Sequence, residues 1–504
     1  MGDIHSGHAD AAAVYRQLDA LMRVPPLCIR RPAMDAYLAY FEEGCPRSRA
    51  LVEEAKVYIP GGVQHNLAFN YPFPLVIERS EGAYLYDADG HRYIDFLQAG
   101  GPTILGGNDP AVRAQVMEML ERVGPSTGLF HEFELKLARE ISRHMPAVEM
   151  FRMLGSGTEA VMAAIRVARL ATGKKKVVKI GGAYHGWSDQ VVYSLKIPGT
   201  RRFEAHGIPR AATRHTREAA PNDLGSLERV LRANRLAGGT ACVLIEPLGP
   251  ESGTRPVDFS YNAGVRRLCD RFGALLVFDE VVTAFRVGLA GAQGYFGVRP
   301  DLTCFGKIVA GGYPSAGGLG GRRDLMMRVA AGIESGKKRA YVGGTMAANP
   351  LSAAAGYFTL REIERTGACA KAARAGDRLT KGLQARLTAR GLPAPAYNQG
   401  SICHLEMVGG MFVKLSLTRI LSALHEIKER KALMEEYGAA YMAEGLVTLA
   451  GSRMYTSAAD TDEVIDDALG RFERVLDAVE PPTVRAPTAR GTVRAPSRGS
   501  ERHG

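Results

Sequence analysis

The stretches Ala274-Leu-Leu-Val-Phe-Asp279 and Leu302-Thr-Cys-Phe-Gly306-Lys307 decide the fold. Each is a short apolar run that ends in a charged residue. Similar apolar runs occur earlier in the chain, and segments of helical composition separate them. Alternation of short strands with helices predicts an α/β domain with a mainly parallel sheet. The earlier runs lie at residues 150–154, 177–180 and 242–245.

The segments on both sides of this domain predict a second, smaller domain. Two short alternating runs at residues 82–95 surround Asp89-Gly90, which is a strong hairpin signal. After Asn349-Pro350 the chain is largely helical, with a β-like piece near 401–407 and amphipathic helices near 417–444 and 462–480. We therefore predict an N-terminal extension (1–50), a first part of the small domain (51–115), a large domain (116–349), a second part of the small domain (350–480) and a disordered basic tail (481–504).

Composition and charge limit the functional classes. The chain has 504 residues, of which 46% are hydrophobic and 23% charged, as in soluble globular proteins. The formal net charge is +11, but the tail alone contributes +4 of it, so we expect no nucleic-acid partner. Both ends of the chain look dispensable, although residues 11–24 have the composition of a helix.

The cysteines and the hydropathy pattern suggest a compartment. The seven cysteines are scattered and have no metal-ligand spacing, which predicts reduced thiols in a cytoplasmic protein and no metal. No apolar run approaches the length of about 18 residues that spans a membrane, so we expect no membrane partner.

The segment Leu154-Gly155-Ser156-Gly157-Thr158-Glu159 joins a predicted strand to a predicted helix. Its small residues would expose backbone N–H groups at the start of the helix, where phosphate binds well. A capped helix start without a ligand is equally compatible with the pattern. The spacing of the glycines also matches a dinucleotide fingerprint, but no acidic residue follows until Asp189, which disfavours NAD.

Tyr184 and His185 follow the next predicted strand. An aromatic ring at that position could stack on a planar ligand, or it could simply be part of the core. Asp279 ends another strand, and a buried carboxylate requires a partner such as a protonated heteroaromatic nitrogen, a metal ion or an arginine. Capping of a helix is the simpler alternative for Asp279.

Lys307 follows Gly306 at the end of a further strand. An amine with apolar neighbours loses hydration, which favours its neutral form and allows a Schiff base with an aldehyde. A surface lysine in a glycine-rich loop is the alternative. Together, a phosphate turn, a stacking aromatic ring, an aspartate and a lysine match one ligand, a phosphorylated pyridine aldehyde.

The segments 278–286, 291–297, 300–303 and 306–314 resemble the class III pyridoxal-phosphate aminotransferases, and most of all their glutamate-1-semialdehyde 2,1-aminomutase branch. The resemblance extends over roughly residues 55–480. It implies fold type I, with a seven-stranded sheet in the large domain and a smaller α+β domain, and pyridoxal 5'-phosphate as the cofactor.

The resemblance also implies a role for each matching residue. Lys307 would hold the cofactor as a Schiff base and move protons, and Asp279 would pair with the pyridine nitrogen. Val281 and Tyr184 would cover the two faces of the ring, while Ser156, Gly157 and Thr158 would bind the phosphate. His185 belongs to the cofactor-binding set, and Thr345 would reach the phosphate of a neighbouring subunit in a homodimer with shared active sites.

The substrate residues are inferred from the same resemblance. Arg453 lies where ornithine-type members keep an arginine for the α-carboxylate of the amino donor, and Glu251 lies in a matching Glu-Pro-x-x-Gly-Glu-x-Gly loop. We hypothesise that Glu251 pairs with Arg453 in the empty site and releases it to a carboxylate. The alternative is that Arg453 is solvated.

Two departures from the aminomutases bear on the reaction. Ala68 occupies about the place of an expected arginine, and Gln98-Ala-Gly-Gly101 replaces their Ser-Trp before Gly-Pro. These changes favour an aminotransferase that moves an amino group from an amino acid, such as glutamate, to an oxo acceptor. An aminomutase or another isomerase on the same scaffold is the alternative within enzymes, and an inactive fold that binds an anionic partner is the alternative outside them.

Overall fold

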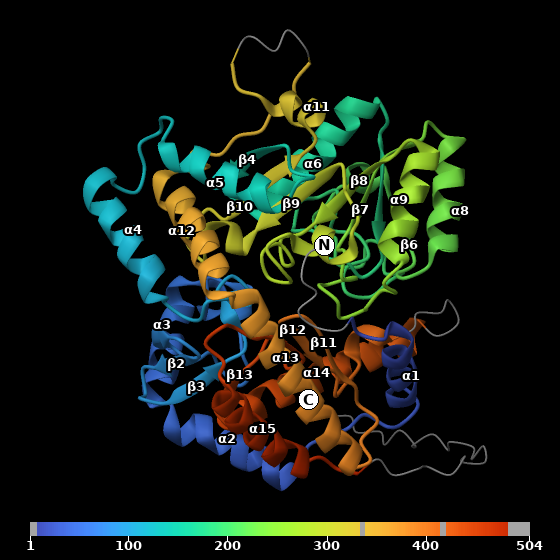
Figure 1. Ribbon diagram of the computed structural model, residues 1–504. Coiled ribbons are helices and arrows are strands. Elements are labelled where there is room, and N and C mark those ends of the chain that lie inside the picture. Colours follow the sequence, from blue (N-terminus) through green and yellow to red (C-terminus); the bar gives the residue numbers. More distant parts are fainter. Residues whose placement is uncertain (1–7, 333–337, 414–419, 482–504) are drawn as a thin grey trace, which may run out of the picture.

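The computed structural model describes residues 8–332, 338–413 and 420–481 (Figure 1). The predicted basic tail therefore lies outside the described residues, except for Pro481. Among the described residues, no helix combines the length and the apolar character that crossing a membrane requires.

A seven-stranded sheet forms the centre of the upper half of the molecule in Figure 1. Its strand order is β4-β10-β9-β8-β7-β5-β6, and only β10 runs against its neighbours, so the predicted mainly parallel α/β fold is confirmed. The strands are β4 (Met150–Leu154), β5 (Lys176–Ile180), β6 (Thr216–Ala219), β7 (Thr240–Ile245), β8 (Leu275–Asp279), β9 (Leu302–Gly306) and β10 (Gly317–Gly321).

Helices cover both faces of this sheet because its strands are apolar on both sides. Helix α6 (Gly157–Thr172) packs on one face through its alanines and valines. Helices α8 (Leu224–Arg235) and α9 (Tyr261–Phe272) pack on the other face. The same face also holds α5 (Glu132–His144) and α12 (Pro350–Thr366), and α4 (Pro110–Val123) lies against α12.

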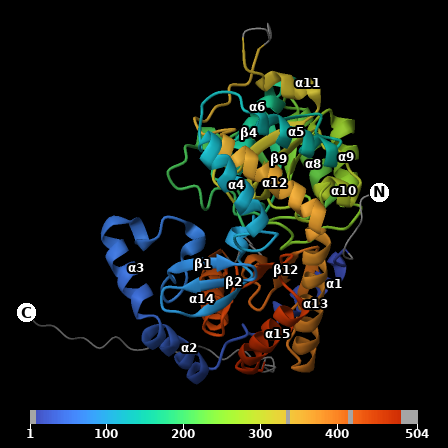
Figure 2. The same cartoon turned by 60° about the vertical axis from the view of Figure 1, so that its left-hand side comes forward.

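Two small sheets lie below the large one (Figure 2). The first has the order β1-β2-β3-β13 and contains the hairpin predicted around Asp89-Gly90. Its strands are β1 (Ile77–Glu81), β2 (Tyr84–Asp87), β3 (Arg92–Asp95) and β13 (Leu446–Val447). The second is formed by β11 (Ala396–Gln399), β12 (Ile402–Leu405) and β14 (Arg453–Tyr455).

The helices around these two sheets share one hydrophobic core. They are α2 (Arg31–Gly44), α13 (Ala368–Ala389), α14 (Ile420–Ala443) and α15 (Asp462–Asp477), and α3 (Pro46–Tyr58) lies beside α2. Aromatic side chains such as Phe41, Phe96 and Phe472 lie fully buried there. The small region is therefore assembled from parts of the chain that lie before and after the large sheet.

The N-terminal extension, which looked dispensable in the sequence, contributes side chains between Val14 and Cys45 to this core. Helix α1 (Ala11–Leu21) buries Val14, Leu18 and Leu21, which recur every three to four residues along one helix face. At its edge, the hydroxyl of Tyr15 donates to the carbonyl of Pro256, and His8 Nε2 lies 2.7 Å from the carbonyl of Val257. The extension thus also contacts the large domain.

Candidate active site

The predicted functional residues follow the carboxyl ends of neighbouring strands, where α/β sheets bind their ligands. Ser156 follows β4, and Tyr184 and His185 follow β5. Asp279 is the last residue of β8, and Lys307 comes directly after β9. The topology therefore brings these side chains to one edge of the large sheet.

The amine of Lys307 donates a hydrogen bond of 2.6 Å to the carbonyl of Gly100. Burial, aided by the nearby cations of Arg453 and Arg286 and opposed by Asp279, lowers the pKa of Lys307 to about 8. Lys307 has φ of +50°, a left-handed conformation that is uncommon outside glycine. The alternative of an ordinary surface lysine is wrong for this residue.

Asp279 is buried and forms a hydrogen bond with His185, whose Nδ1 lies 2.7 Å from Asp279 Oδ2. The other oxygen, Oδ1, accepts the backbone N–H of Val281 at 3.2 Å. Burial lowers the pKa of His185, although the carboxylate acts in the opposite direction. The neutral imidazole therefore donates from Nδ1, and its buried Nε2 has no hydrogen-bond partner among the described residues.

Val281 lies between the turn at residues 155–158 and Gly306, the residue before Lys307. A Cβ at Gly157 would lie 2.8 Å from one methyl group of Val281, and a Cβ at Gly306 would lie 2.7 Å from the other. Glycine is thus required at both positions for the close approach of the two turns. The hydroxyl of Ser156 caps α6 by accepting from the N–H of Glu159 at 3.3 Å.

Capping by Ser156 does not satisfy the whole helix start. The first four N–H groups of a helix have no partner within it, so those of Gly157 and Thr158, unlike that of Glu159, are not bonded by the Ser156 side chain. The loop with Tyr184 packs tightly here, since a Cβ at Gly186 would lie 2.3 Å from Thr158 Oγ1.

Glu246 is a site residue that the sequence did not identify. It is the first residue of the Glu-Pro-x-x-Gly-Glu-x-Gly loop, and we predicted no role for it. Its carboxylate accepts the backbone N–H groups of Tyr184 at 2.9 Å and of Glu251 at 2.8 Å, and the hydroxyl of Ser252 at 3.0 Å. Burial raises the pKa of Glu246 to about 7. Its position just after β7 was the signal that could have identified it.

Glu251 and Arg453 lie together, as the switch hypothesis requires. Arg453 donates to the carbonyl of Glu251 at 2.8 Å, and its Nη2 lies 3.4 Å from Glu251 Oε1. The side chain of Arg453 is only 14% exposed, so the alternative of a solvated arginine is wrong.

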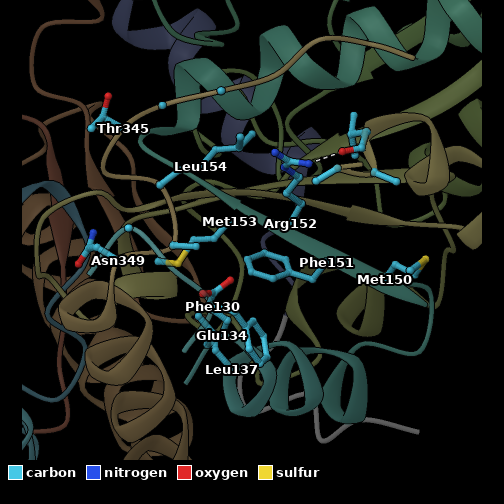
Figure 3. Close-up of a pocket in the computed structure, with 18 of the residues that line it drawn as sticks. Phe130, Glu134, Leu137, Met150, Phe151, Arg152, Met153, Leu154, Thr345 and Asn349 are labelled. Atoms are coloured by element: carbon cyan, nitrogen blue, oxygen red, sulfur yellow. Dashed lines mark hydrogen bonds between the residues drawn. The ribbon is translucent and has the colours of Figure 1, made fainter. Parts of the chain in front are cut away.

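Thr345 lines a pocket that contains none of the other predicted site residues. This pocket of about 560 Å³ lies beside β4 and is also lined by Phe130, Met153 and Asn349 (Figure 3). Neither Lys307 nor Asp279 lines this pocket. Gly344, the residue before Thr345, approaches Glu159 at the start of α6.

Comparison with solved structures gives the same fold. An omega-transaminase from Sphaerobacter thermophilus is 27% identical, with a TM-score of 0.76 over 87% of this chain and 99% of that chain. A transaminase solved with PLP bound is 27% identical, with a TM-score of 0.75 over 86% and 97%. A glutamate-1-semialdehyde aminomutase from Pseudomonas aeruginosa PAO1 is 24% identical, with a TM-score of 0.74 over 92% and 99%, which supports the fold alone.

The sequence pattern of the family described as aminotransferase class-III matches residues 67–476. This range contains the large sheet, both small sheets and all the site residues described above. By sequence and by fold, the chain belongs to the class-III aminotransferase family.

Proposed function

We propose that the protein is a pyridoxal phosphate-dependent aminotransferase, which moves an amino group from an amino acid donor to an oxo acceptor. The arrangement of Lys307 and the buried Asp279–His185 pair at the ends of adjacent strands supports this function most strongly. When bound, pyridoxal phosphate supplies an electron sink that stabilises negative charge on the substrate carbon.

The residues of the site fit this cofactor. Each oxygen of Asp279 accepts one hydrogen bond, and a carboxylate has about four acceptor positions, so it can also accept from a protonated ring nitrogen. Val281 would pack on one face of the ring and Tyr184, which is half-exposed, on the other. The N–H groups at Ser156, Gly157 and Thr158 would bind the phosphate, as helix starts do.

Lys307 supplies the acid and base of the reaction. With its pKa lowered to about 8, its amine can take a proton from the substrate carbon near neutral pH and return it to a second atom. The carbonyl of Gly100 accepts a hydrogen bond from this amine and thereby fixes its direction. His185 acts through Asp279, because it holds that carboxylate in place.

Glu251 and Arg453 would let one pocket accept two unlike substrates. In the absence of a substrate carboxylate the two side chains pair, and a carboxylate would displace Glu251 from the guanidinium. Glutamate is a suitable donor for such a switch, since it carries two carboxylates.

We also propose a homodimer with shared active sites. The pocket with Thr345 is bordered by exposed apolar side chains, of which Leu129 is 81% and Phe130 is 76% exposed. Large exposed apolar patches commonly mark protein interfaces. A second copy that covers this patch would bring its Thr345 toward the phosphate site of the first copy. The other proposed partners are small molecules, namely the amino donor and the oxo acceptor.

A cytoplasmic location is proposed on the state of the cysteines. All seven are free thiols, six of them buried, and stable free thiols are typical of reducing compartments.

The proposed function can be tested by following the absorbance of the bound cofactor. Purified protein should absorb near ~420 nm, bleach with an amino donor and recover its colour with an oxo acid. Lys307→Ala should abolish the adduct trapped by borohydride. If glutamate-1-semialdehyde without any donor gives 5-aminolevulinate rapidly, the aminotransferase proposal is wrong and the aminomutase alternative is right.

A further inference from the structure

Unpartnered polar atoms gather where loop 251–255 faces the sheet β11-β12-β14. Sixteen buried side-chain polar atoms of the described residues lack a hydrogen-bond partner, and six of them belong to five side chains here. Native proteins leave few such atoms unsatisfied, so this cluster requires partners, which a bound ligand, an ion or water can supply. The atoms are Glu251 Oε2, Arg255 Nε, Gln399 Oε1 and Nε2, Glu406 Oε1 and Arg453 Nε.

Gln399 contributes both of its amide atoms to this cluster, and its side chain is only 1% exposed. Strand pairing aligns Tyr397 with His404 and Arg453, and Gln399 lies two residues beyond Tyr397. Alternate residues of a strand share a face, so Gln399 and Arg453 point to the same side of this sheet. The two side chains can therefore meet one ligand.

Gly253 brings the amide of Gln399 to the loop that carries Glu251. A Cβ at Gly253 would lie 2.6 Å from Gln399 Oε1, so any larger residue would exclude the amide. Arg453 contacts the same loop two residues earlier, through the carbonyl of Glu251. The amide of Gln399 and the guanidinium of Arg453 thus flank a single short turn.

The chemistry of these groups matches a carboxylate. Arg453 Nε and Gln399 Nε2 are both donors, and a carboxylate is a strong acceptor for two parallel donors. His404, stacked on Tyr397, has its pKa lowered to about 3 by burial and by Arg453, so it adds no charge. Glu406 lies on the same face, and burial raises its pKa to about 7.

We propose that Gln399 is a specificity-determining residue, which binds the substrate carboxylate through Nε2 together with Arg453 once Glu251 has moved aside. This proposal rests on the aminotransferase function proposed above. A half-turn of the amide exchanges Oε1 and Nε2, so the donor can face the ligand without a change of backbone.

The experiment compares Gln399→Leu with Gln384→Leu in the full-length holoenzyme. Gln384 is a half-buried residue of α13 that accepts a hydrogen bond from the N–H of Ala396 on β11, so its variant perturbs the same strand outside the site. The first measurement is the dissociation constant of glutarate, a dicarboxylate that cannot donate an amino group, by calorimetry. The second is the rate at which hydroxylamine, an amine without a carboxylate, bleaches the cofactor.

Gln399→Leu should weaken glutarate binding at least tenfold, as expected for loss of a hydrogen bond to a charged group, and leave the hydroxylamine rate within twofold. Its melting temperature should stay or rise, because the variant removes an unpartnered amide. Gln384→Leu should leave glutarate binding unchanged. The proposal is overturned if glutarate binding in Gln399→Leu is unchanged, or if both readouts and the melting temperature fall together. Failure of all amino donors to bleach the wild type would instead reject the proposed function.

Discussion

At Asp279, we expect a substitution that barely changes the size of the side chain to have a large effect on the reaction rate. Asparagine keeps its size but removes the negative charge that would hold a proton on the ring nitrogen. We expect Asp279→Asn to lower the single-turnover rate with an amino donor by about 10²–10³-fold, the usual effect of losing one preorganised electrostatic contact. An unchanged rate, with the cofactor still bound, would contradict the role of Asp279.

Lys307 gives a prediction about pH. Its lowered pKa of about 8 means that the neutral, nucleophilic fraction rises as pH increases toward that value and is nearly complete above it. The rate at which apoprotein captures pyridoxal phosphate should therefore rise about tenfold per pH unit below 8 and level off above it, whereas an ordinary lysine would level off near 10.4. Stopped-flow absorbance near ~420 nm measures this rate.

Arg453 supplies a control for the pH profile. Since its cation lowers the pKa of Lys307, Arg453→Met should move the break in the profile to higher pH. A break that stays in place would show that Arg453 does not contribute to the lowered pKa of Lys307.

Individual site residues could be predicted because each lies directly after an apolar run. The contacts between them could not, since they join distant parts of the chain. The bond between His185 and Asp279 spans 94 positions, and the anchoring of Lys307 by Gly100 spans 207. Their pairing is a consequence of strand order, which periodicity does not reveal. The roles assigned to the site residues stay predictions until variants are measured.

Strand β10 could not be predicted from the sequence. Four of its five residues are glycine, a residue depleted in strands, so the apolar-run criterion misses it. The structure explains the composition, because a Cβ at Gly317 would lie 2.4 Å from the backbone of Ser156, and one at Gly318 would meet the ring of Phe151. Glycine there allows β4 and the phosphate turn to approach.

Gly317→Ala should therefore displace the phosphate turn. The expected result is weaker binding of pyridoxal phosphate together with a lower melting temperature, since the backbone of Ser156 must shift. Equilibrium dialysis of the cofactor and thermal unfolding of the apoprotein measure the two effects. Gly297→Ala is the control, because nothing lies within 4 Å of a Cβ at that position, although its φ of +63° still costs some stability. Equal cofactor affinity in both variants would contradict the expectation.

At the scale of the whole molecule, we expect the packing of α1 in the core of the small region to contribute to stability. Leu18 is 2% exposed in the core of the small region, so Leu18→Ala should lower the free energy of unfolding by about 2–5 kcal/mol. Leu236→Ala, at a position that is 93% exposed, should change it by less than about 0.5 kcal/mol. Urea denaturation followed by circular dichroism measures both, and similar values for the two variants would contradict the packing of α1.

The sequence predicted an α/β sheet and a hairpin but underestimated residues 8–50. Helix α1 has a regular apolar face, but the sequence does not show what covers that face, because residues that share its core lie hundreds of positions away on α14 and α15. The domain boundaries at 51–115, 116–349 and 350–480 stay predictions.

The contacts of Tyr15 and His8 with Pro256 and Val257 affect how this enzyme could be redesigned. Pro256 and Val257 follow the loop that begins with Glu251, so we expect exchanges at His8 and Tyr15 to shift this loop without touching a substrate. Directed evolution for new substrates should therefore randomise residues 8–21 along with the pocket, and improved clones should carry exchanges there.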